Sequence, residues 1–462
     1  MGGNFTNINE LGLALIILAG SLTLALPRRF APIPLLAVGM YMTMGQTLDV
    51  FGLHFDVLRV MLLFGWTRLI LRSEVADIRL NEIDMALLGW VVVNAALYSL
   101  REMSVAALIN RLGFVYDAVG FYFFFRALVR CKEDCLILIK ALALLAIPLA
   151  CLMVLEKATG KNPFHYFGGV PEFVPEREGR LRCQGPFRHP ILAGTFGAVA
   201  VPLCVGLWTE GKDRVAAVAA AVASTVMVVT SASSGPVLAY IAAIVVLPLW
   251  VLRGYLRELR WAAVAAVVAL HFVMKAPVWY IFDRISDFLG GTGWHRSELI
   301  DQAITRIDEW WLLGTSQTSH WMPYKLRLFD AADITNQYIA HGLDGGLATM
   351  VLFIAVIALC FRRVGLAVRA ADTTEEESPA EGFSAEEAPE EEPAGTIPHY
   401  LPWALGSALF VHVVSFVSVV YFDQMVVYWY MLLAMIACLP TGREDDRWSA
   451  GVVDRERMDG ME

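Results

Sequence analysis

Residues 281–346 read IFDRISDFLGGTGWHRSELIDQAITRIDEWWLLGTSQTSHWMPYKLRLFDAADITNQYIAHGLDGG, the longest stretch of the chain that resembles neither a membrane span nor low-complexity sequence. Apolar segments flank it on both sides. It holds three histidines, four arginines and four tryptophans, together with several carboxylates. A polar stretch of this length between apolar segments is where we expect chemistry, so it is predicted to cover a functional site.

The flanking apolar segments decide the fold class. The chain has 462 residues, of which 57% are hydrophobic and 18% charged. Its apolar residues come in blocks of roughly 17–25, the length that crosses the hydrocarbon core of a bilayer. Lipid offers the backbone no hydrogen-bond partners, so such blocks are predicted to be helices. We therefore expect an all-α, polytopic integral membrane protein.

About thirteen blocks reach spanning length, or about twelve if the first lies in the interface instead. They are 11–26, 32–48, 54–71, 84–100, 105–127, 134–155, 190–208, 214–231, 235–252, 261–280, 345–361, 400–420 and 425–439. The predicted regions are N-terminal membrane helices (1–155), a first polar loop (156–189), central membrane helices (190–280), a large, partly helical loop acting as a lid (281–344), one membrane helix (345–362), an acidic loop (363–398), C-terminal membrane helices (399–440) and a tail (441–462).

Basic residues set the predicted orientation. They recur in every second short loop, from Arg28-Arg29 to Arg362-Arg363, and the side that carries them is expected to be cytoplasmic. The two longer loops then lie outside. The net charge of −9 comes from ten acids in 371–393, a segment predicted to be disordered and cytoplasmic. The first block lacks the features of a removable signal peptide. Seven cysteines are scattered without metal-ligand spacing, so no metal or cofactor is expected.

Ionisable residues within the spans are candidate functional groups, because each costs at least about 2.5 kcal/mol in mid-bilayer. Arg59, Arg111 and Lys275 fall near the outer ends of their spans, and Asp117 is deeper, where it could pair with one of them. Arg68 and Arg126 are expected to anchor the cytoplasmic ends by snorkelling.

A cluster of cations is therefore predicted at the outer face. Its members are Arg59, Arg111, Arg182, Arg188, Lys275 and Arg296. Guanidinium groups form paired, charge-assisted hydrogen bonds with phosphate oxygens. We expect the cluster to bind a lipid phosphate or diphosphate, such as a polyprenyl-diphosphate-linked sugar. The alternative is contact with lipid headgroups at the outer surface.

The large loop has a helical pattern of its own over Ser297–Trp311. Its apolar face is made of Leu299, Ile300, Ala303, Ile304, Ile307 and Trp311, and Leu313-Gly314 ends it. The tryptophans Trp310, Trp311 and Trp321 fit either an interfacial aromatic belt or stacking on sugar faces.

A second pattern precedes the next span. In a helix, Asp333, Gln337 and His341 share one face, which would present an acid, an amide and an imidazole. The alternative is an ordinary solvated face. The glycines of 342–346 predict a bend directly after it.

Three motifs together resemble the O-antigen ligase and polymerase family. Residues 182–190, RCQGPFRHP, resemble the family signature Arg-x-x-Gly-x-Phe-x-(His/Asn)-Pro. Arg296 resembles its second loop arginine. Residues 336–339, NQYI, with Gly342, Gly345 and Gly346, resemble its His-Asn-x-Tyr-Leu…Gly-x-x-Gly element. The resemblance covers most of 84–440.

The resemblance implies an inverting, metal-independent glycosyl transfer at the periplasmic face of a bacterial inner membrane. The donor would be a polyprenyl-diphosphate-linked glycan, and the acceptor another glycan (polymerase) or the lipid A core (ligase). Arg182 and Arg296 would hold the diphosphate and stabilise the charge that develops on it. Membrane lipids and other polysaccharide-assembly proteins are the expected partners, and nucleic acid is not.

Two departures from the family pattern affect the predicted mechanism. Thr335 stands where the family has a histidine, and 233–235, SSG, lacks the arginine that the family often has there. His320, Asp333 and His341 are the candidates to activate the acceptor instead. Polymerase is preferred over ligase, and a flippase or a non-catalytic assembly scaffold is the alternative, although no internal repeat typical of transporters is evident.

Overall fold

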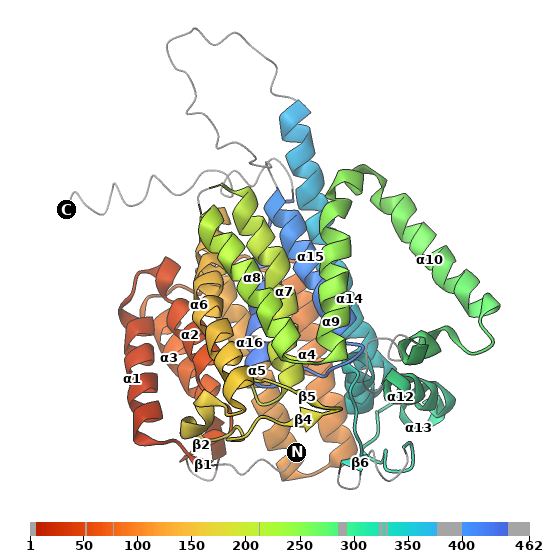
Figure 1. Cartoon of the computed structure of the whole chain (residues 1–462), viewed down its shortest axis with the longest axis horizontal. Coiled ribbons are helices and arrows are strands. Elements are labelled where there is room, and N and C mark those ends of the chain that lie inside the picture. The colour runs from red at the N-terminus through yellow and green to blue at the C-terminus, as the bar shows by residue number, and fades with distance from the viewer. Residues whose placement is uncertain are drawn as a thin grey trace.

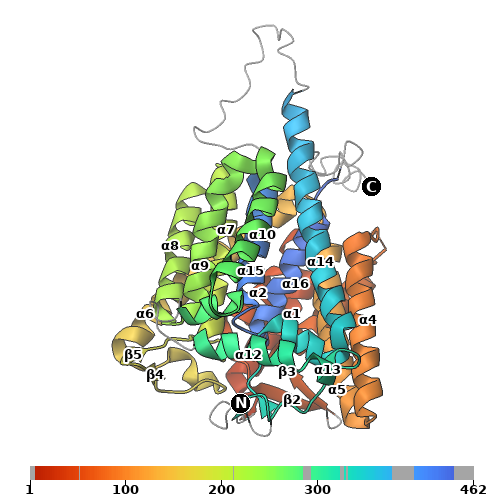
Figure 2. The ribbon, with the colours of Figure 1, turned by 90° about the vertical axis from the view of Figure 1, so that its right-hand side faces the viewer.

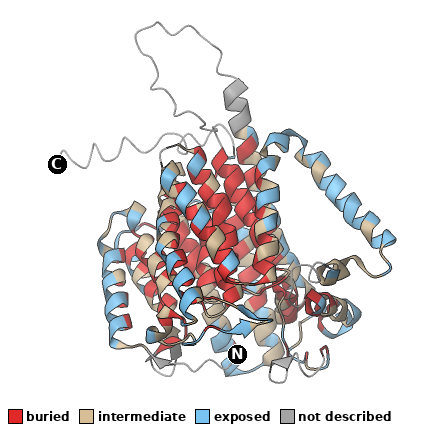
Figure 3. Ribbon diagram, in the orientation of Figure 1, coloured by how far each residue is buried: buried red, intermediate tan, exposed pale blue. Residues whose placement is uncertain are grey.

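The computed structural model describes residues 6–50, 53–76, 78–211, 213–284, 293–322, 327–328, 331–376 and 400–441. Figure 1 shows a bundle of helices that run alternately up and down, and in Figure 3 the buried residues fill its centre. Within the described ranges, 5 helices are long and apolar enough to cross a membrane. The predicted all-α class is confirmed, and the long apolar helices indicate a multi-pass membrane protein.

The apolar helices follow the predicted blocks in order. They are α1 (Glu10–Ala25), α2 (Ile33–Tyr41), α3 (Val57–Leu71), α4 (Glu82–Glu102), α5 (Val105–Leu128), α6 (Lys132–Thr159), α7 (Pro190–Thr209), α8 (Arg214–Thr230), α9 (Ser234–Val246), α10 (Leu256–Val273), α14 (Gln337–Glu376), α15 (Tyr400–Ser415) and α16 (Gln424–Ala437). Short 3-10 helices are η1 (Arg28–Phe30), η2 (Pro163–Phe167), η3 (Leu247–Tyr255) and η4 (Val278–Tyr280).

The remaining elements gather at one end of the bundle, here called the strand end (Figures 1 and 2). They are strands β1 (Thr6–Asn7), β2 (Gln46–Val50) and β3 (Leu53–Asp56), paired in the order β1-β2-β3, the hairpins β4 (Glu176–Arg177) with β5 (Arg180–Leu181) and β6 (Arg327–Leu328) with β7 (Ala331–Ala332), and helices α12 (Gly293–Thr305) and α13 (Ile307–Trp310). η1 and η3 lie at the opposite end of the bundle.

Some elements differ from their predicted extents. The predicted span 32–48 yields only the short α2, because the chain pairs as β2 from Gln46 onward. α10 has no buried residue and leans away from the bundle (Figure 1). α14 continues to Glu376, past the predicted end at 362. The rest of the predicted acidic loop, 377–398, which includes most of the segment predicted to be disordered, lies outside the described residues.

The predicted bend in α14 is present at its two central glycines. Gly345 has φ −159° and ψ 37°, and Gly346 has φ 73° and ψ −171°. The conformation of Gly346 is open to glycine but not to L-residues. A Cβ on Gly346 would also lie 2.4 Å from the carbonyl oxygen of Leu312. The bend lets α13 dock against α14, where Leu347 N donates to Trp311 O at 2.8 Å.

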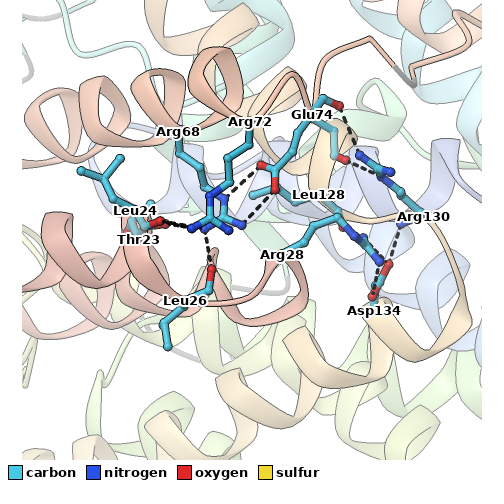
Figure 4. A network of polar contacts seen from close by, with 11 residues as sticks. Thr23, Leu24, Leu26, Arg28, Arg68, Arg72, Glu74, Leu128, Arg130 and Asp134 are labelled. Atoms are coloured by element: carbon cyan, nitrogen blue, oxygen red, sulfur yellow. Dashed lines mark hydrogen bonds and ion pairs between the residues drawn. The ribbon is translucent and has the colours of Figure 1, made fainter. Parts of the chain in front are cut away.

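Arg68 and Arg126 are not snorkelling anchors. The Arg68 side chain is 0% exposed and forms an ion pair with Glu74 at 2.9 Å. It also donates to the carbonyls of Thr23 and Leu26 (Figure 4), which have no helical partner because α1 ends there. Arg126 pairs in the same way with a fully buried carboxylate, that of Asp84, at 3.2 Å.

Candidate functional site

The loop that carries the first motif is held from three sides. Glu156, buried near the end of α6, accepts the backbone N–H groups of Gln184 (3.0 Å) and Gly185 (2.8 Å). Asn162 donates to the Gly185 carbonyl at 2.8 Å, and Gln424 of α16 donates to the Pro186 carbonyl at 3.0 Å. Such hydrogen bonds from separate elements hold the loop in one conformation.

The β4–β5 hairpin positions Arg182 at the surface of the bundle. Its turn residues Glu178 (φ 53°) and Gly179 (φ 71°) both have positive φ, as in a type I′ turn. Arg182 follows β5, and its Nη2 donates to Ser233 Oγ at 2.8 Å. Its Nε is buried and has no hydrogen-bond partner among the described residues.

Arg296 reaches the same place from the large loop. It is buried in α12, and a Cβ on Gly235 would lie 3.5 Å from its Nη2. Burial, and then the charge of Arg177, lowers the pKa of Arg296 to about 10 and lowers that of Arg182 as well. Within the described ranges, neither guanidinium forms an ion pair with a carboxylate.

The two arginines meet at the N-terminus of α9. Ser233 is the N-cap, but its hydroxyl donates to Ser231 O at 2.9 Å and does not cap the helix. Among the described residues no side chain caps α9, so the N–H groups of Ser234 and Gly235 lack a side-chain acceptor, and a helix N-terminus with free N–H groups favours an anion. We call Arg182, Arg296, Ser233 and this helix end the cationic site. The sequence marked 233–235 only as a departure from the family pattern.

His189 borders this site as the N-cap of α7, and its Nδ1 accepts the N–H of Ile191 at 3.2 Å. Burial, followed by Arg182 and Arg177, lowers the pKa of His189 to about 4. The imidazole is thus neutral at physiological pH. It positions the helix and adds no charge to the site.

The other predicted cations have carboxylate partners or lie elsewhere. Three ion pairs account for most of them: Arg59 with Asp117 (2.7 Å), Arg111 with Asp344 (3.0 Å) and Arg188 with Asp423 (3.0 Å). Lys275 is exposed beyond the end of α10, and the structure does not bring it to the others. The six predicted cations therefore do not form one cluster.

A cavity of about 350 Å³ lies at the strand end beside these pairs. Its charged lining is Asp56, Arg59, Arg111, Asp117, Asp344 and Asp423, and its aromatic lining includes Trp90, Phe114, Phe353, Phe416, Trp429 and Tyr430. We call it the aspartate cavity. Gln337 and His341 of α14 complete one wall.

The hydrogen bonds of Gln337 fix the tautomer of His341. The backbone N–H of Tyr421 donates to Gln337 Oε1 at 2.6 Å, so the Gln337 amide nitrogen faces His341 Nε2 at 2.8 Å. His341 Nε2 is therefore the acceptor, and in the neutral ring Nδ1 carries the hydrogen. Nδ1 is buried without a partner among the residues the structure describes.

The other two candidate acceptor bases lie apart from His341. Asp333 is exposed, and α14 begins only at Gln337 because Asn336 caps it by accepting the N–H of Tyr338 (3.0 Å). The predicted face of Asp333, Gln337 and His341 is therefore wrong for Asp333. His320 contacts Glu309 at 2.9 Å on the surface of the large loop.

The predicted helix over 297–311 is broken into α12 and α13 at Arg306. The break lets Trp310 turn inward, where its indole N–H donates to Ala303 O at 2.9 Å. Leu299, Ala303 and Trp310 are buried, whereas Ile304, Ile307 and Trp311 are exposed, contrary to the predicted apolar face.

One segment separates the cationic site from the aspartate cavity. On one side, Ser418 Oγ would lie 2.7 Å from a Cβ on Gly235. On the other side, Phe416 and residues 420–423 line the cavity, and Phe416 O accepts the N–H of Gln337 at 2.8 Å. The two sites are therefore neighbours across a single stretch of chain, 416–423.

Sequence reasoning missed Glu156, Asp344 and Asp423. All three lie at or beyond the ends of the apolar blocks, so they did not stand out as charges inside a span. The available signal was an isolated acid between two apolar blocks, as at Asp423. Comparison with known proteins adds no relative, since no family model and no curated protein matches the chain.

Proposed function

We propose that this chain is a membrane glycosyltransferase that transfers a polyprenyl-diphosphate-linked glycan, most simply as a polysaccharide polymerase. One observation carries the proposal. Arg182 and Arg296, on separate loops, converge on the uncapped N-terminus of α9 without a carboxylate partner among the described residues. Buried guanidinium groups beside a helix N-terminus suit a diphosphate.

The chemistry proposed for the cationic site is electrostatic. The diphosphate departs with a negative charge, and guanidinium groups already in position stabilise that charge without reorganisation. A pKa of about 10 leaves Arg296 protonated at neutral pH, so it keeps this capacity despite its burial. His189 is neutral and therefore does not add to the positive charge that binds the anion.

The proposed orientation puts the strand end in the periplasm of a bacterium. The connections at the opposite end carry basic residues such as Arg28, Arg72 and Arg253, as expected of cytoplasmic loops. The apolar helices would then cross the inner membrane about thirteen times, with the N-terminus outside. The cationic site would open toward substrates that have already been translocated.

Arginine variants in the native host test the proposal. Arg182→Ala and Arg296→Ala are expected to shorten the polymer and to accumulate single lipid-linked repeat units on the outer face. Arg180→Ala, in the same hairpin but exposed, is the matched control. Units that accumulate inside would indicate a flippase, and loss of glycan from the lipid A core alone would indicate a ligase. Normal polymer in both arginine variants would refute the site.

A further inference from the structure

The charges of the aspartate cavity exclude the diphosphate as its occupant. Two arginines and four aspartates line it, which gives a formal charge of −2 with His341 neutral. Both arginines are also engaged, since Arg59 holds Asp117 through two hydrogen bonds of 2.8 and 2.7 Å. An anion in this cavity would be repelled by the carboxylates, and the two arginines could not offset this repulsion because they already bind aspartates.

The cavity nevertheless has unused hydrogen-bonding capacity. The ring N–H groups of Trp90 (3% exposed) and His341 (5% exposed) both lack a partner within the described part of the chain. Their ring centroids are 4.9 Å apart, so the two donors belong to one wall. A buried donor without an acceptor is costly, and such a pair in a cavity points to a ligand that supplies oxygen atoms.

A neutral ligand rich in hydroxyl groups matches this lining. Hydroxyl groups both donate and accept, so they can satisfy indole and imidazole N–H groups and aspartate oxygens together. Aromatic rings such as Phe114 and Trp429 offer flat apolar surfaces to the C–H faces of a sugar ring. The volume of about 350 Å³ falls within the usual range for small-molecule sites.

Asp423 is the cavity carboxylate that belongs to the segment between the cavity and the cationic site. It ends the dividing segment 416–423 and contacts Arg188 of the first-motif loop at 3.0 Å. It is the N-cap residue of α16, with a positive φ of 53° that is uncommon for a non-glycine residue. Asp117 and Asp344 are held by Arg59 and Arg111, and Asp56 accepts the Arg59 backbone N–H at the start of α3.

We propose that the aspartate cavity is the subsite for the acceptor sugar and that Asp423 is the base that accepts its proton. The inference rests on the proposed glycosyl transfer. The acceptor hydroxyl oxygen forms the new bond to the anomeric carbon of the donor, and its proton passes to Asp423. The bond from that carbon to the diphosphate breaks, and the electron pair leaves with the diphosphate, held by Arg182 and Arg296.

The pKa of Asp423 suits this role. Burial raises it to about 6, Arg188 opposes the rise, and Asp56 and Asp117 add to it. A carboxylate with a pKa closer to neutrality is a stronger base and is still ionised at pH 7. Asp423 thereby replaces His320, Asp333 and His341 as the proposed base, while His341 binds the sugar.

The test uses the full-length protein in lipid nanodiscs with two separate readouts. Saturation-transfer NMR measures binding of free glucose, galactose, N-acetylglucosamine and rhamnose. A polyprenyl-diphosphate disaccharide then measures transfer. Ala340→Phe fills the cavity, and Ala348→Phe makes the same change at an exposed position of the same helix. Asp423→Asn removes the base, and Asp213→Asn removes an ion-paired carboxylate at the opposite end.

At least one sugar is expected to bind to the wild type, to Ala348→Phe and to Asp423→Asn. Its affinity for Ala340→Phe is expected to be at least tenfold lower. Asp423→Asn is expected to slow transfer by about 10²–10⁴-fold, whereas Asp213→Asn is expected to leave the transfer rate unchanged.

Equal sugar binding by the two phenylalanine variants, or no sugar binding by any of the proteins, would overturn the subsite. Normal transfer by Asp423→Asn would overturn the base. Sugar binding without transfer by the wild type would refute the proposed function and the base together, and would leave the sugar site standing.

Discussion

At the scale of single residues, the arginines fall into two groups according to their partners, a distinction that the sequence alone does not make. Arg59, Arg111 and Arg188 each meet an aspartate, so their charges are largely used within the protein. Arg182 and Arg296 meet a serine hydroxyl and a glycine instead. Of these five arginines, Arg182 and Arg296 keep their charge available for an anion, since neither has a carboxylate partner in the part of the chain that the structure describes.

The pKa of Asp423 predicts how transfer depends on pH. The base must be ionised to accept a proton, and its pKa is raised to about 6. Transfer is therefore expected to fall about tenfold for each pH unit below 6 and to level off above it. The charged groups that act on Asp423 are Arg188, Asp56 and Asp117. Initial rates from pH 4.5 to 8.5 measure the profile, and a rate that is flat down to pH 4.5 would contradict the assignment.

Sequence analysis selected Arg182 and Arg296, which the structure brings together, but it predicted only part of the pairing among the other charged residues. Arg182 and Arg296 could be predicted because the surrounding motifs and loop positions singled them out. Asp117 is expected from the sequence to pair with Arg59, Arg111 or Lys275. That its partner is Arg59, and that Asp333 lies outside the helix of His341, depends on side-chain contacts and on the cap at Asn336. Such contacts join residues far apart in the sequence, and periodicity does not report them.

At the scale of elements, the bend in α14 connects the large loop to the bundle. Gly346 adopts a conformation that only glycine takes readily, and its missing Cβ leaves room for the Leu312 carbonyl. The bend places Gln337 and His341 on the cavity while the rest of α14 continues as an apolar helix. Gly365 lies further along the same helix, where an added Cβ would meet no atom of the described residues within 4 Å.

Gly346→Ala and Gly365→Ala are expected to act in opposite directions. The alanine at 346 meets about 1–3 kcal/mol of backbone strain, in addition to the clash with Leu312. The alanine at 365 extends a helix and should stabilise by up to about 1 kcal/mol. Thermal unfolding in detergent, followed by intrinsic fluorescence, compares the two. A Gly346→Ala variant as stable as the wild type would show that the bend is not required.

The buried ion pair at the opposite end makes a second prediction at this scale. Arg68→Ala leaves Glu74 without its partner and the last carbonyls of α1 without donors, at an expected cost of about 3–5 kcal/mol. Arg362→Ala removes an exposed pair, with side chains 60% and 64% exposed, and should cost about 0–1 kcal/mol. The melting temperatures of the two variants measure this difference. Equal decreases in melting temperature would mean that Arg68 contributes no more to stability than the exposed Arg362.

Hydropathy predicted the apolar helices because an apolar run that finds no hydrogen-bond partners in lipid must satisfy its backbone internally, as a helix does. It could not predict where tertiary contacts interrupt an element. β2 replaces the end of the span 32–48 by pairing with β3, and the helix over 297–311 is broken at Arg306, which lets Trp310 turn into the core. Both interruptions follow from contacts that form only in the folded chain.

At the scale of the whole molecule, the proposal requires the two ends of the bundle to face different compartments. Glu178, in the β4–β5 turn, and Glu258, at the start of α10, are exposed at opposite ends (Figure 1). With the native cysteines replaced, Glu178→Cys is expected to react with a membrane-impermeant maleimide in intact spheroplasts. Glu258→Cys should react only after permeabilisation. Labelling of both from the same side would contradict the orientation.

The two sites divide the work of the proposed reaction. The cationic site takes the diphosphate of the donor, and the aspartate cavity, across the segment 416–423, takes the acceptor. This separation predicts that donor binding is independent of the cavity and depends on Arg182 and Arg296.

Native mass spectrometry of the purified protein with a polyprenyl-diphosphate disaccharide tests this central claim most directly. We predict that Arg182→Ala and Arg296→Ala each weaken donor binding at least tenfold, and that Arg180→Ala and Ala340→Phe bind the donor as the wild type does. Wild-type affinity in both arginine variants would contradict the account.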